Sequence, residues 1–238
     1  MRSFLAGIVL VVALIAAGCG GGGSPTTTAS SSGDNGMASK SPSEVLKATT
    51  KAAESASSLH MTGNVTTSGK KIELDLKIAK DKGAVGSISL NGKKVDLVVV
   101  GKNGYLKADS AFWNQFAGSS GAMIAQLLAG RWLKFPVDNA QFQPLVAFSS
   151  PNAFFDSLKS GADSALKNDG KTTYKGQSVV ALNDGEEGTL YVAATGTPYP
   201  VALAKTGSES GSIEFSDWNA AVSVSAPENV LDFSHLTG

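Results

Sequence analysis

The sequence contains one cysteine, Cys19, and the residues before it could direct a specific covalent change of its thiol. Ile15-Ala16-Ala17-Gly18 place small side chains beside the cysteine, as in the lipobox, the signal at which a bacterial signal peptidase cuts. Ala16 stands where lipoboxes usually carry leucine. We expect the thiol of Cys19 to take a diacylglyceryl group with chains such as palmitate.

The segment upstream of Cys19 has the features of an export signal. Met1-Arg2 is a short positive region, and the apolar run 4–17 is shorter than the ~20 residues of a spanning helix. Residues 20–40 are rich in Gly, Ser and Thr and cannot bury enough surface to fold. We therefore predict a signal peptide (1–18), a lipidated Cys19 with a flexible tether (19–40), and a protein at the extracytoplasmic face of the cell membrane. The alternatives are an uncleaved anchor and an ordinary secreted protein.

Two short patterns match serine enzymes that interact with penicillin. Ser164-Ala165-Leu166-Lys167 fits S-x-x-K, and Lys205-Thr206-Gly207 fits K-T-G. The S-D-N element is missing between them, and a spacing of about 40 residues is too small for the body that such enzymes need. We interpret both matches as coincidence.

Other reactive groups are sparse. His60 and His235 are the only histidines, so with one cysteine there is no ligand set for a Cys/His zinc site. No nucleophile is paired with either histidine, and no phosphate-binding glycine motif is present. Glu73 with Asp75, and the pair 186–187, fit solvated positions better than an acid–base pair. The sequence predicts no enzyme, no metal and no cofactor.

Composition excludes a further class. The chain carries 20 basic and 20 acidic residues, a net charge of zero, and only 17% of its residues are charged. Because nucleic-acid binders need a strong basic patch, we expect no nucleic-acid partner.

The elements that position these residues begin with a helix. Ser41-Pro42-Ser43-Glu44 is a capping box with proline in the first turn, which predicts a helix over 42–57. Residues 71–80 alternate strictly between apolar and charged, as in a strand with one wet face. Asn91-Gly92 predicts a type I′ hairpin. Folding about this turn pairs Leu90 with Lys93, Ile88 with Val95, Gly86 with Leu97, and Ala84 with Val99. Gly and Ala on the buried face would leave room above it.

The rest of the chain alternates between blocks of helix and blocks of strand. Helices are predicted within 111–129 and 151–166, with a short extended piece at 132–135 between them. Strands are predicted at 172–182, 188–194, 199–205, 212–217 and 221–225. Segregated helices and strands indicate one α+β domain (41–238) with a curved antiparallel sheet and helices on its concave face.

Several short motifs, in this order and spacing, resemble one group of proteins. They are Ser58-Leu59-His60-Met61-Thr62-Gly63, Gly104-Tyr105-Leu106-Lys107, Ala111-Phe112-Trp113, Gly130-Arg131-Trp132-Leu133-Lys134, Phe215-Ser216-Asp217-Trp218-Asn219, and Val222-Ser223-Val224-Ser225-Ala226-Pro227. With the lipobox, they resemble the LppX/LprG-type lipoproteins of mycobacteria and other actinobacteria. The resemblance covers nearly all of 41–238, and segment 116–160 is its least similar part.

The resemblance implies a LolA-like half-open β-barrel that holds acyl chains of lipids or acylated glycolipids between sheet and helices. The candidate cavity residues are apolar side chains of the sheet and of the helical segments. They are Ile72, Leu74, Leu76, Ile78, Ile88, Val95, Leu97, Val99, Phe116, Met123, Leu127, Phe154, Phe155 and Leu158. Whether the sheet residues form solid core or a cavity wall stays open at this point. The implied partners are a lipid, the membrane through Cys19, and a membrane transporter as a further candidate.

Three functions are therefore compared. The first is an envelope lipoprotein that binds lipid or glycolipid and carries or presents it across the envelope. The second is a non-catalytic interaction or sensor module of the same fold without bound lipid. The third, a cell-wall hydrolase, lacks a credible nucleophile or metal set.

Overall fold

The computed structural model describes residues 33–67, 69–150, 155, 166–185, 188–207 and 210–235. These belong to one compact unit, Ser32–Gly238. Several residues named above lie outside the described residues. They are Cys19 with 20–32 of the predicted tether, Phe154, Leu158, Ser164, Glu186 and Glu187.

Helices and strands follow one another in the order α1, β1 to β5, α2, α3, β6, α4, and then β7 to β12. The helices are α1 Pro42–Ser55, α2 Ser110–Phe116, α3 Gly121–Leu127 and α4 Gln143–Val146. The strands are β1 Ser58–Thr67, β2 Lys70–Ala79, β3 Gly83–Leu90, β4 Lys93–Val100, β5 Asn103–Ala108, β6 Trp132–Pro136, β7 Lys167–Tyr174, β8 Gln177–Asn183, β9 Gly188–Ala193, β10 Pro200–Lys205, β11 Gly211–Ser216 and β12 Val230–Asp232. Short 3₁₀ helices lie at Met37–Ser39, Gly118–Ser120, Ala147–Ser149 and Phe233–His235.

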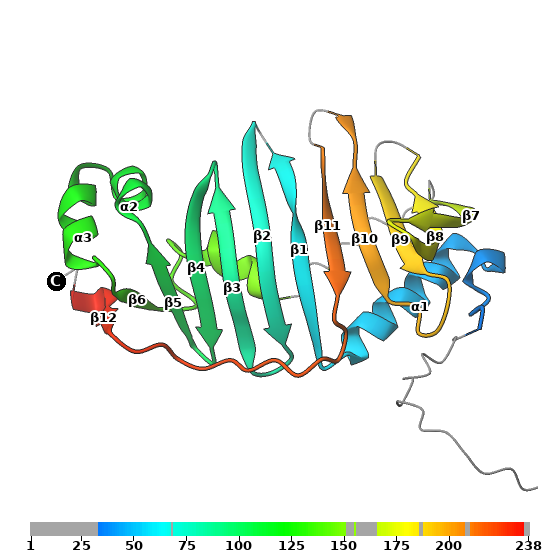
Figure 1. Ribbon diagram of the computed structural model, residues 1–238, viewed down its shortest axis with the longest axis horizontal. Coiled ribbons are helices and arrows are strands. Elements are labelled where there is room, and N and C mark those ends of the chain that lie inside the picture. Colours follow the sequence, from blue (N-terminus) through cyan, green and yellow to red (C-terminus); the bar gives the residue numbers. More distant parts are fainter. Residues whose placement is uncertain are drawn as a thin grey trace, which may run out of the picture. The chain divides into compact units, whose positions relative to one another are not determined.

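All twelve strands of the described residues form one curved, unclosed sheet (Figure 1). Its order is β12-β6-β5-β4-β3-β2-β1-β11-β10-β9-β8-β7. Two meanders, β1 to β6 and β7 to β11, meet where β1 pairs antiparallel with β11. Only β12 pairs in parallel, with β6. The predicted α+β class with a curved antiparallel sheet is confirmed.

Local sequence signals account for the first elements. The Ser41 hydroxyl accepts the Glu44 backbone N–H at 3.4 Å, and the Glu44 carboxylate accepts the Ser41 N–H at 3.0 Å. This is the predicted capping box, and it also lowers the pKa of Glu44. The hairpin at Asn91-Gly92 has the predicted register in all four pairs. Asn91 adopts a positive φ of 51°, as a type I′ turn requires.

Two predictions for the C-terminal half are wrong. The single strand expected at 172–182 is a hairpin, in which β7 turns at Lys175-Gly176 and Tyr174 pairs with Gln177. Residues 221–225 form no strand, although they alternate. In Figure 1 the connection from β11 to β12 runs along the ends of the strands, where no edge is free to pair. Trp218, two residues after β11, stacks on Tyr199 at 4.6 Å.

The end of the described chain is held to β6 by strand pairing and by an ion pair of Asp232, which also accepts two hydrogen bonds from Ser234. Asp232 accepts the backbone N–H and the hydroxyl of Ser234 at 3.1 and 2.9 Å, and its carboxylate lies 3.1 Å from Lys134 Nζ. The hydrogen bonds from Ser234, with the Lys134 charge, lower the pKa of Asp232 from 3.8 to about 2. The folded state therefore favours the ionised carboxylate.

Acid is expected to loosen β12 before the rest of the sheet. Because the folded pKa of Asp232 is below its unfolded value, its contribution is complete above pH 3.8 and disappears as the pH falls toward about 2. Solvent screening limits this contribution to about 1 kcal/mol. The protection factors of the Val230–Asp232 amides, which compare each measured exchange rate with the intrinsic rate at the same pH, should fall over this range in the wild type. Asp232→Asn should exchange faster at neutral pH and show a flatter acid profile; an unchanged profile would refute the assignment.

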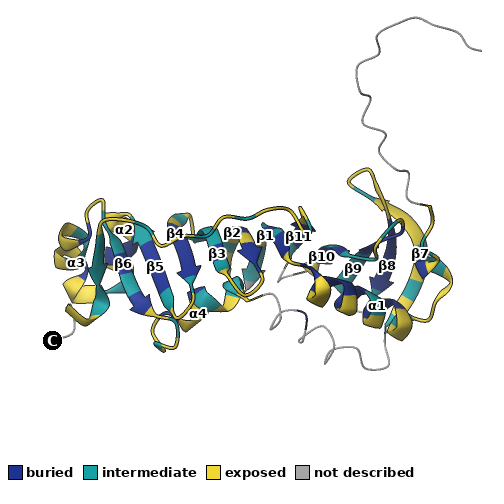
Figure 2. Cartoon of the chain, turned by 90° about the horizontal axis from the view of Figure 1, so that it is seen from below, coloured by how far each residue is buried: buried dark blue, intermediate teal, exposed yellow. Residues whose placement is uncertain are grey.

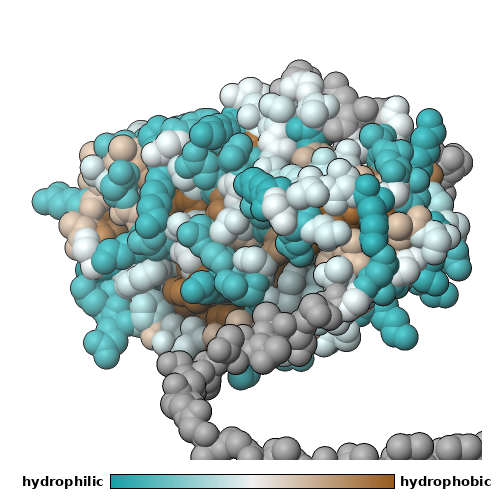
Figure 3. Space-filling view, turned by 45° about the vertical axis from the view of Figure 1, so that its right-hand side comes forward, coloured by the Kyte–Doolittle hydropathy of each residue, from teal (hydrophilic) through white to brown (hydrophobic). Residues whose placement is uncertain are grey.

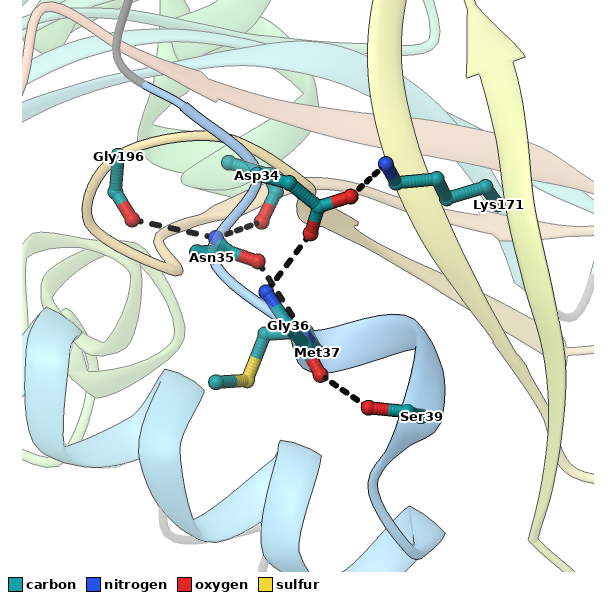
Figure 4. A network of polar contacts seen from close by, with 8 residues as sticks. Asp34, Asn35, Gly36, Met37, Ser39, Lys171 and Gly196 are labelled. Carbon is teal, nitrogen blue, oxygen red and sulfur yellow. Dashed lines mark hydrogen bonds and ion pairs between the residues drawn. The ribbon is translucent and has the colours of Figure 1, made fainter.

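The residues before α1 are also attached to the sheet, which corrects the predicted end of the tether at Lys40. Figure 4 shows Asp34 paired with Lys171 of β7 and Asn35 turned toward the loop after β9. Asn35 Nδ2 donates to the carbonyls of Ala193 and Gly196 at 2.7 and 3.1 Å. Met37 is buried against α1 and β8 to β10. The folded unit therefore begins no later than Asp34, because these polar and apolar contacts outweigh the low apolar content of the segment.

Buried side chains gather on one face of the sheet, here called the inner face. It is defined by Leu74, Leu76 and Ile78 of β2, which are 4%, 0% and 2% exposed. Helices α1 and α4 lie on the same side of the sheet, with their outer surfaces exposed (Figure 2). Within the described residues no helix is long and apolar enough to cross a bilayer.

Candidate functional site

The inner face carries an apolar row that crosses nine strands from β5 to β8. Its members are direct partners in the register of neighbouring strands and join the two meanders. They are Ala108, Val95, Ile88, Leu74, Gly63, Ile213, Leu203, Leu190 and Leu182. An apolar surface of this length is the feature that a bound alkyl chain requires.

The structure brings the predicted sheet residues together on this face. Seven are buried and belong to one cluster, and Ile72 is half-buried against it. The buried seven are Leu74, Leu76, Ile78, Ile88, Val95, Leu97 and Val99. Helix α2 packs over them through Phe112 and Trp113, which are 4% and 3% exposed. Much of this surface is therefore covered by helix side chains in the structure.

The predicted helical residues divide into two groups. Phe155 is 1% exposed and lies near Phe215 of β11 and Trp218, at ring distances of 5.6 and 6.3 Å. Phe116 is half-buried and packs against the cluster. Met123 and Leu127, however, are 61% and 45% exposed and do not pack onto the inner face, so their role as cavity residues stays a prediction. They share one side of the seven-residue helix α3, and the helix turns its opposite side inward.

Sequence reasoning missed an aromatic group at the β5–β6 end of the face. Phe142 is completely buried and stacks with Phe135 and Phe116 at 4.1 and 6.0 Å. The Phe135 ring lies over Gly104, where an added Cβ would come within 2.3 Å of the ring. The room that glycine leaves is thus filled by an aromatic side chain at this position. The available signal was a lone phenylalanine between two glutamines, Gln141 and Gln143.

Two of the hollows that the described residues form open onto the apolar surface and have mainly apolar linings. The first, the α2 hollow, has a volume of about 340 Å³ and lies between α2 and the ends of β2 to β4. It is lined by Lys70, Lys71, Ile72, Leu90, Asn91, Lys93, Phe112, Gln115 and Phe116. The second, the α1 hollow, has a volume of about 280 Å³ and includes Leu182, Leu190 and Leu203 of the apolar row. Both volumes are close to the lower limit for ligand pockets, ~300 Å³.

The surface outside these hollows is mainly polar on the side that Figure 3 shows. Hydrophilic residues and residues of intermediate hydropathy cover most of this side, and hydrophobic surface appears only as patches between them. An alkyl chain on this side would therefore find its contacts in recesses.

Among the described residues, the polar side chains considered for chemistry do not form a catalytic group. His60 lies within β1, where its Nε2 is 2.7 Å from Asp75 and its Nδ1 is 3.3 Å from Asp217. This ring links β1, β2 and the residue after β11, which is a structural role. The described residues contain no group of three or more His, Cys, Asp or Glu side chains that could hold a metal. Lys167 begins β7 and Lys205 ends β10.

A curved, unclosed sheet with helices on its inner face defines an α+β half-barrel. The chain shares this fold with LprF from Mycobacterium bovis, at a TM-score of 0.53 and 14% identity over 78% of this chain and 96% of that chain. It also shares it with the Mycobacterium tuberculosis lipoprotein LppX, at a TM-score of 0.51 and 17% identity over 77% of this chain and 98% of that chain. No protein-family model and no curated protein sequence matches the chain. The expected LppX/LprG-like fold is confirmed.

Proposed function

We propose that this protein is a lipid-anchored envelope lipoprotein that binds acyl chains of a lipid or glycolipid on its inner face and carries or presents them across the envelope. The observation that carries the proposal is the apolar row from β5 to β8, with one hollow beside its β2–β4 part and another at its β8–β10 part. Cys19 supplies the anchor, and the tether ahead of Asp34 lets the folded unit approach or leave the membrane.

The energetics favour binding without catalysis. Each CH₂ group moved from water into an apolar site contributes ~0.8 kcal/mol, so a chain of several groups binds through contact alone. The α2 hollow supplies Ile72, Leu90 and Phe116 for such contact. A longer chain would need α2 to move from the sheet and expose Leu97 and Val95. The fold shared with the lipoprotein LppX is consistent with this arrangement.

Filling the α2 hollow tests the proposal. Ile72→Trp places a larger side chain in the hollow, whereas Glu73→Trp places the same side chain on the opposite face of β2. The assay mixes a protein of residues 32–238 with phosphatidylcholine vesicles that contain a pyrene-labelled lysophospholipid, which has a single acyl chain, and follows uptake by loss of excimer emission. We expect uptake by the wild type and the Glu73 variant, and at least a fivefold reduction for Ile72→Trp.

Absence of uptake by the folded wild type would instead favour the interaction module without lipid. Equal uptake by both tryptophan variants would show that the chain binds elsewhere. Circular dichroism and the thermal midpoint of each variant establish that the comparison is between folded proteins.

A further inference from the structure

The α2 hollow combines an apolar floor with a basic rim. Ile72, Leu90, Phe112 and Phe116 form the apolar part. Lys70, Lys71 and Lys93 lie at its border, and the lining contains no acidic residue. A site with this division suits a molecule that has an alkyl chain and a negatively charged end.

The register of the strands places two of these lysines on the inner face. Lys93 is the direct partner of Leu90 across the Asn91-Gly92 hairpin, and Leu90 is in turn the partner of Ile72. Lys70 lies two residues before Ile72 and therefore on the same side of β2. The two ammonium groups thus border the Leu90–Ile72 pair from different strands.

Their electrostatic setting differs from that of lysines that alternate with acids along the same strands. Lys71 lies 2.7 Å from Glu73, and Lys94 lies 3.2 Å from Asp96, so those charges are compensated within their own strand. Among the described residues, neither Lys70 nor Lys93 forms an ion pair. An anion that enters the hollow would therefore meet two cations that have no competing carboxylate.

We infer that the α2 hollow selects anionic single-chain amphiphiles, with the alkyl chain on Ile72, Leu90 and Phe116 and a carboxylate or phosphate between Lys70 and Lys93. This inference rests on the proposed function and adds the charge class of the ligand. Gln115 of α2 and Asn91 of the hairpin border the same hollow and offer amide groups to the polar end. The small volume favours one alkyl chain over several.

The test compares two probes with the same chain, pyrenedodecanoic acid and its methyl ester, on a protein of residues 32–238. The wild type should bind the acid at least tenfold more tightly than the ester. The ester has no charged carboxylate, so it cannot form the charged hydrogen bonds to the lysines. The double variant Lys70→Gln with Lys93→Gln should bind the acid about tenfold more weakly than the wild type does. Its affinity for the ester should not change. The control changes Lys77→Gln and Lys94→Gln on the opposite face of the same two strands and should leave both affinities unchanged.

The outcomes separate the two proposals. Two results would overturn the anion-selective hollow and leave lipid binding intact. The first is equal affinity of the wild type for acid and ester, and the second is an equal loss of affinity for the acid in the inner-face and the control double variants. Binding of neither probe by folded protein overturns the proposed function as well. Competition with inorganic phosphate shows whether the anion must carry an alkyl chain. If 10 mM phosphate fails to displace the acid, the result supports an amphiphile as the ligand. If phosphate displaces the acid fully, the hollow is a phosphate site and the inference is overturned.

Discussion

Replacing Cys19 with alanine is expected to abolish covalent lipid labelling of this protein completely. The thiol is the attachment point in the predicted lipobox, and the chain has no second cysteine that could replace it. Two acyl chains give stable membrane attachment, whereas one gives only marginal binding. The apolar run at 4–17 is shorter than the ~20 residues that a spanning helix needs, so it is a poor substitute for that anchor.

Metabolic labelling with palmitate, read on the purified protein by mass spectrometry, measures this effect. The Cys19→Ala protein should carry no label and should keep the mass of residues 1–18, because processing depends on the modified cysteine. Ser24→Ala, in the same predicted tether, is the matched control and should be labelled and processed normally. Palmitate on the alanine variant would contradict the lipobox assignment.

Replacing Gly86 with alanine is expected to cost at least about 3 kcal/mol of unfolding free energy. Gly86 has a φ of +153°, and a Cβ there would lie 2.0 Å from the Asp75 carbonyl oxygen and 2.9 Å from Leu76 Cα. Both obstacles are backbone atoms of β2, so no side chain can move aside. The neighbouring strand would have to separate from β3 in the middle of the sheet that carries the inner face.

Urea unfolding of residues 32–238 followed by tryptophan fluorescence measures the loss. Ser87→Ala, the next residue of the same strand, meets no such obstacle and should change stability by less than about 0.5 kcal/mol. Two variants that unfold at the same urea concentration would show that the close approach of β2 and β3 at Gly86 is not required. A cost of 3 kcal/mol is a large part of the 5–15 kcal/mol typical of a domain.

Gly86 also shows what the sequence could and could not predict. The hairpin that contains it is determined by two adjacent residues and an alternating pattern, so its register could be predicted pair by pair. The need for glycine at this position could not be predicted, because the atom that a Cβ would meet is the carbonyl oxygen of Asp75 in another strand. The prediction that Gly and Ala on the buried face of this hairpin leave room was thus incomplete at Gly86. At Gly104, which that prediction did not include, the Phe135 ring occupies the space.

The elements that sequence reasoning missed depend on distant partners. β12 exists because Val230–Asp232 meets β6, about a hundred residues earlier in the chain, and its local pattern gives no signal of this. Residues 221–225 alternate like a strand but form none, and the connection from β11 to β12 that contains them runs along the ends of the strands. The segment at Asp34 resembles a linker in composition, yet hydrogen bonds to the loop after β9 attach it.

The candidate site was predictable only where it depends on local sequence patterns. Apolar alternation placed Leu74, Leu97 and their neighbours on one face, since alternation is a local property. The orientation of α3 could not be predicted from the sequence, because Met123 and Leu127 are as apolar as the residues on its inward side. That Lys70 and Lys93 lie beside the same hollow follows only from the strand register, which brings together residues of β2 and β4.

Native mass spectrometry of residues 32–238, purified from a mycobacterial host, tests lipid binding most directly. We expect the protein to carry an added mass of lipid size that organic solvent releases, and the released lipid to contain an acyl chain. A protein that arrives without added mass, and remains so after incubation with total envelope lipid, would contradict the account and leave the fold as an interaction module.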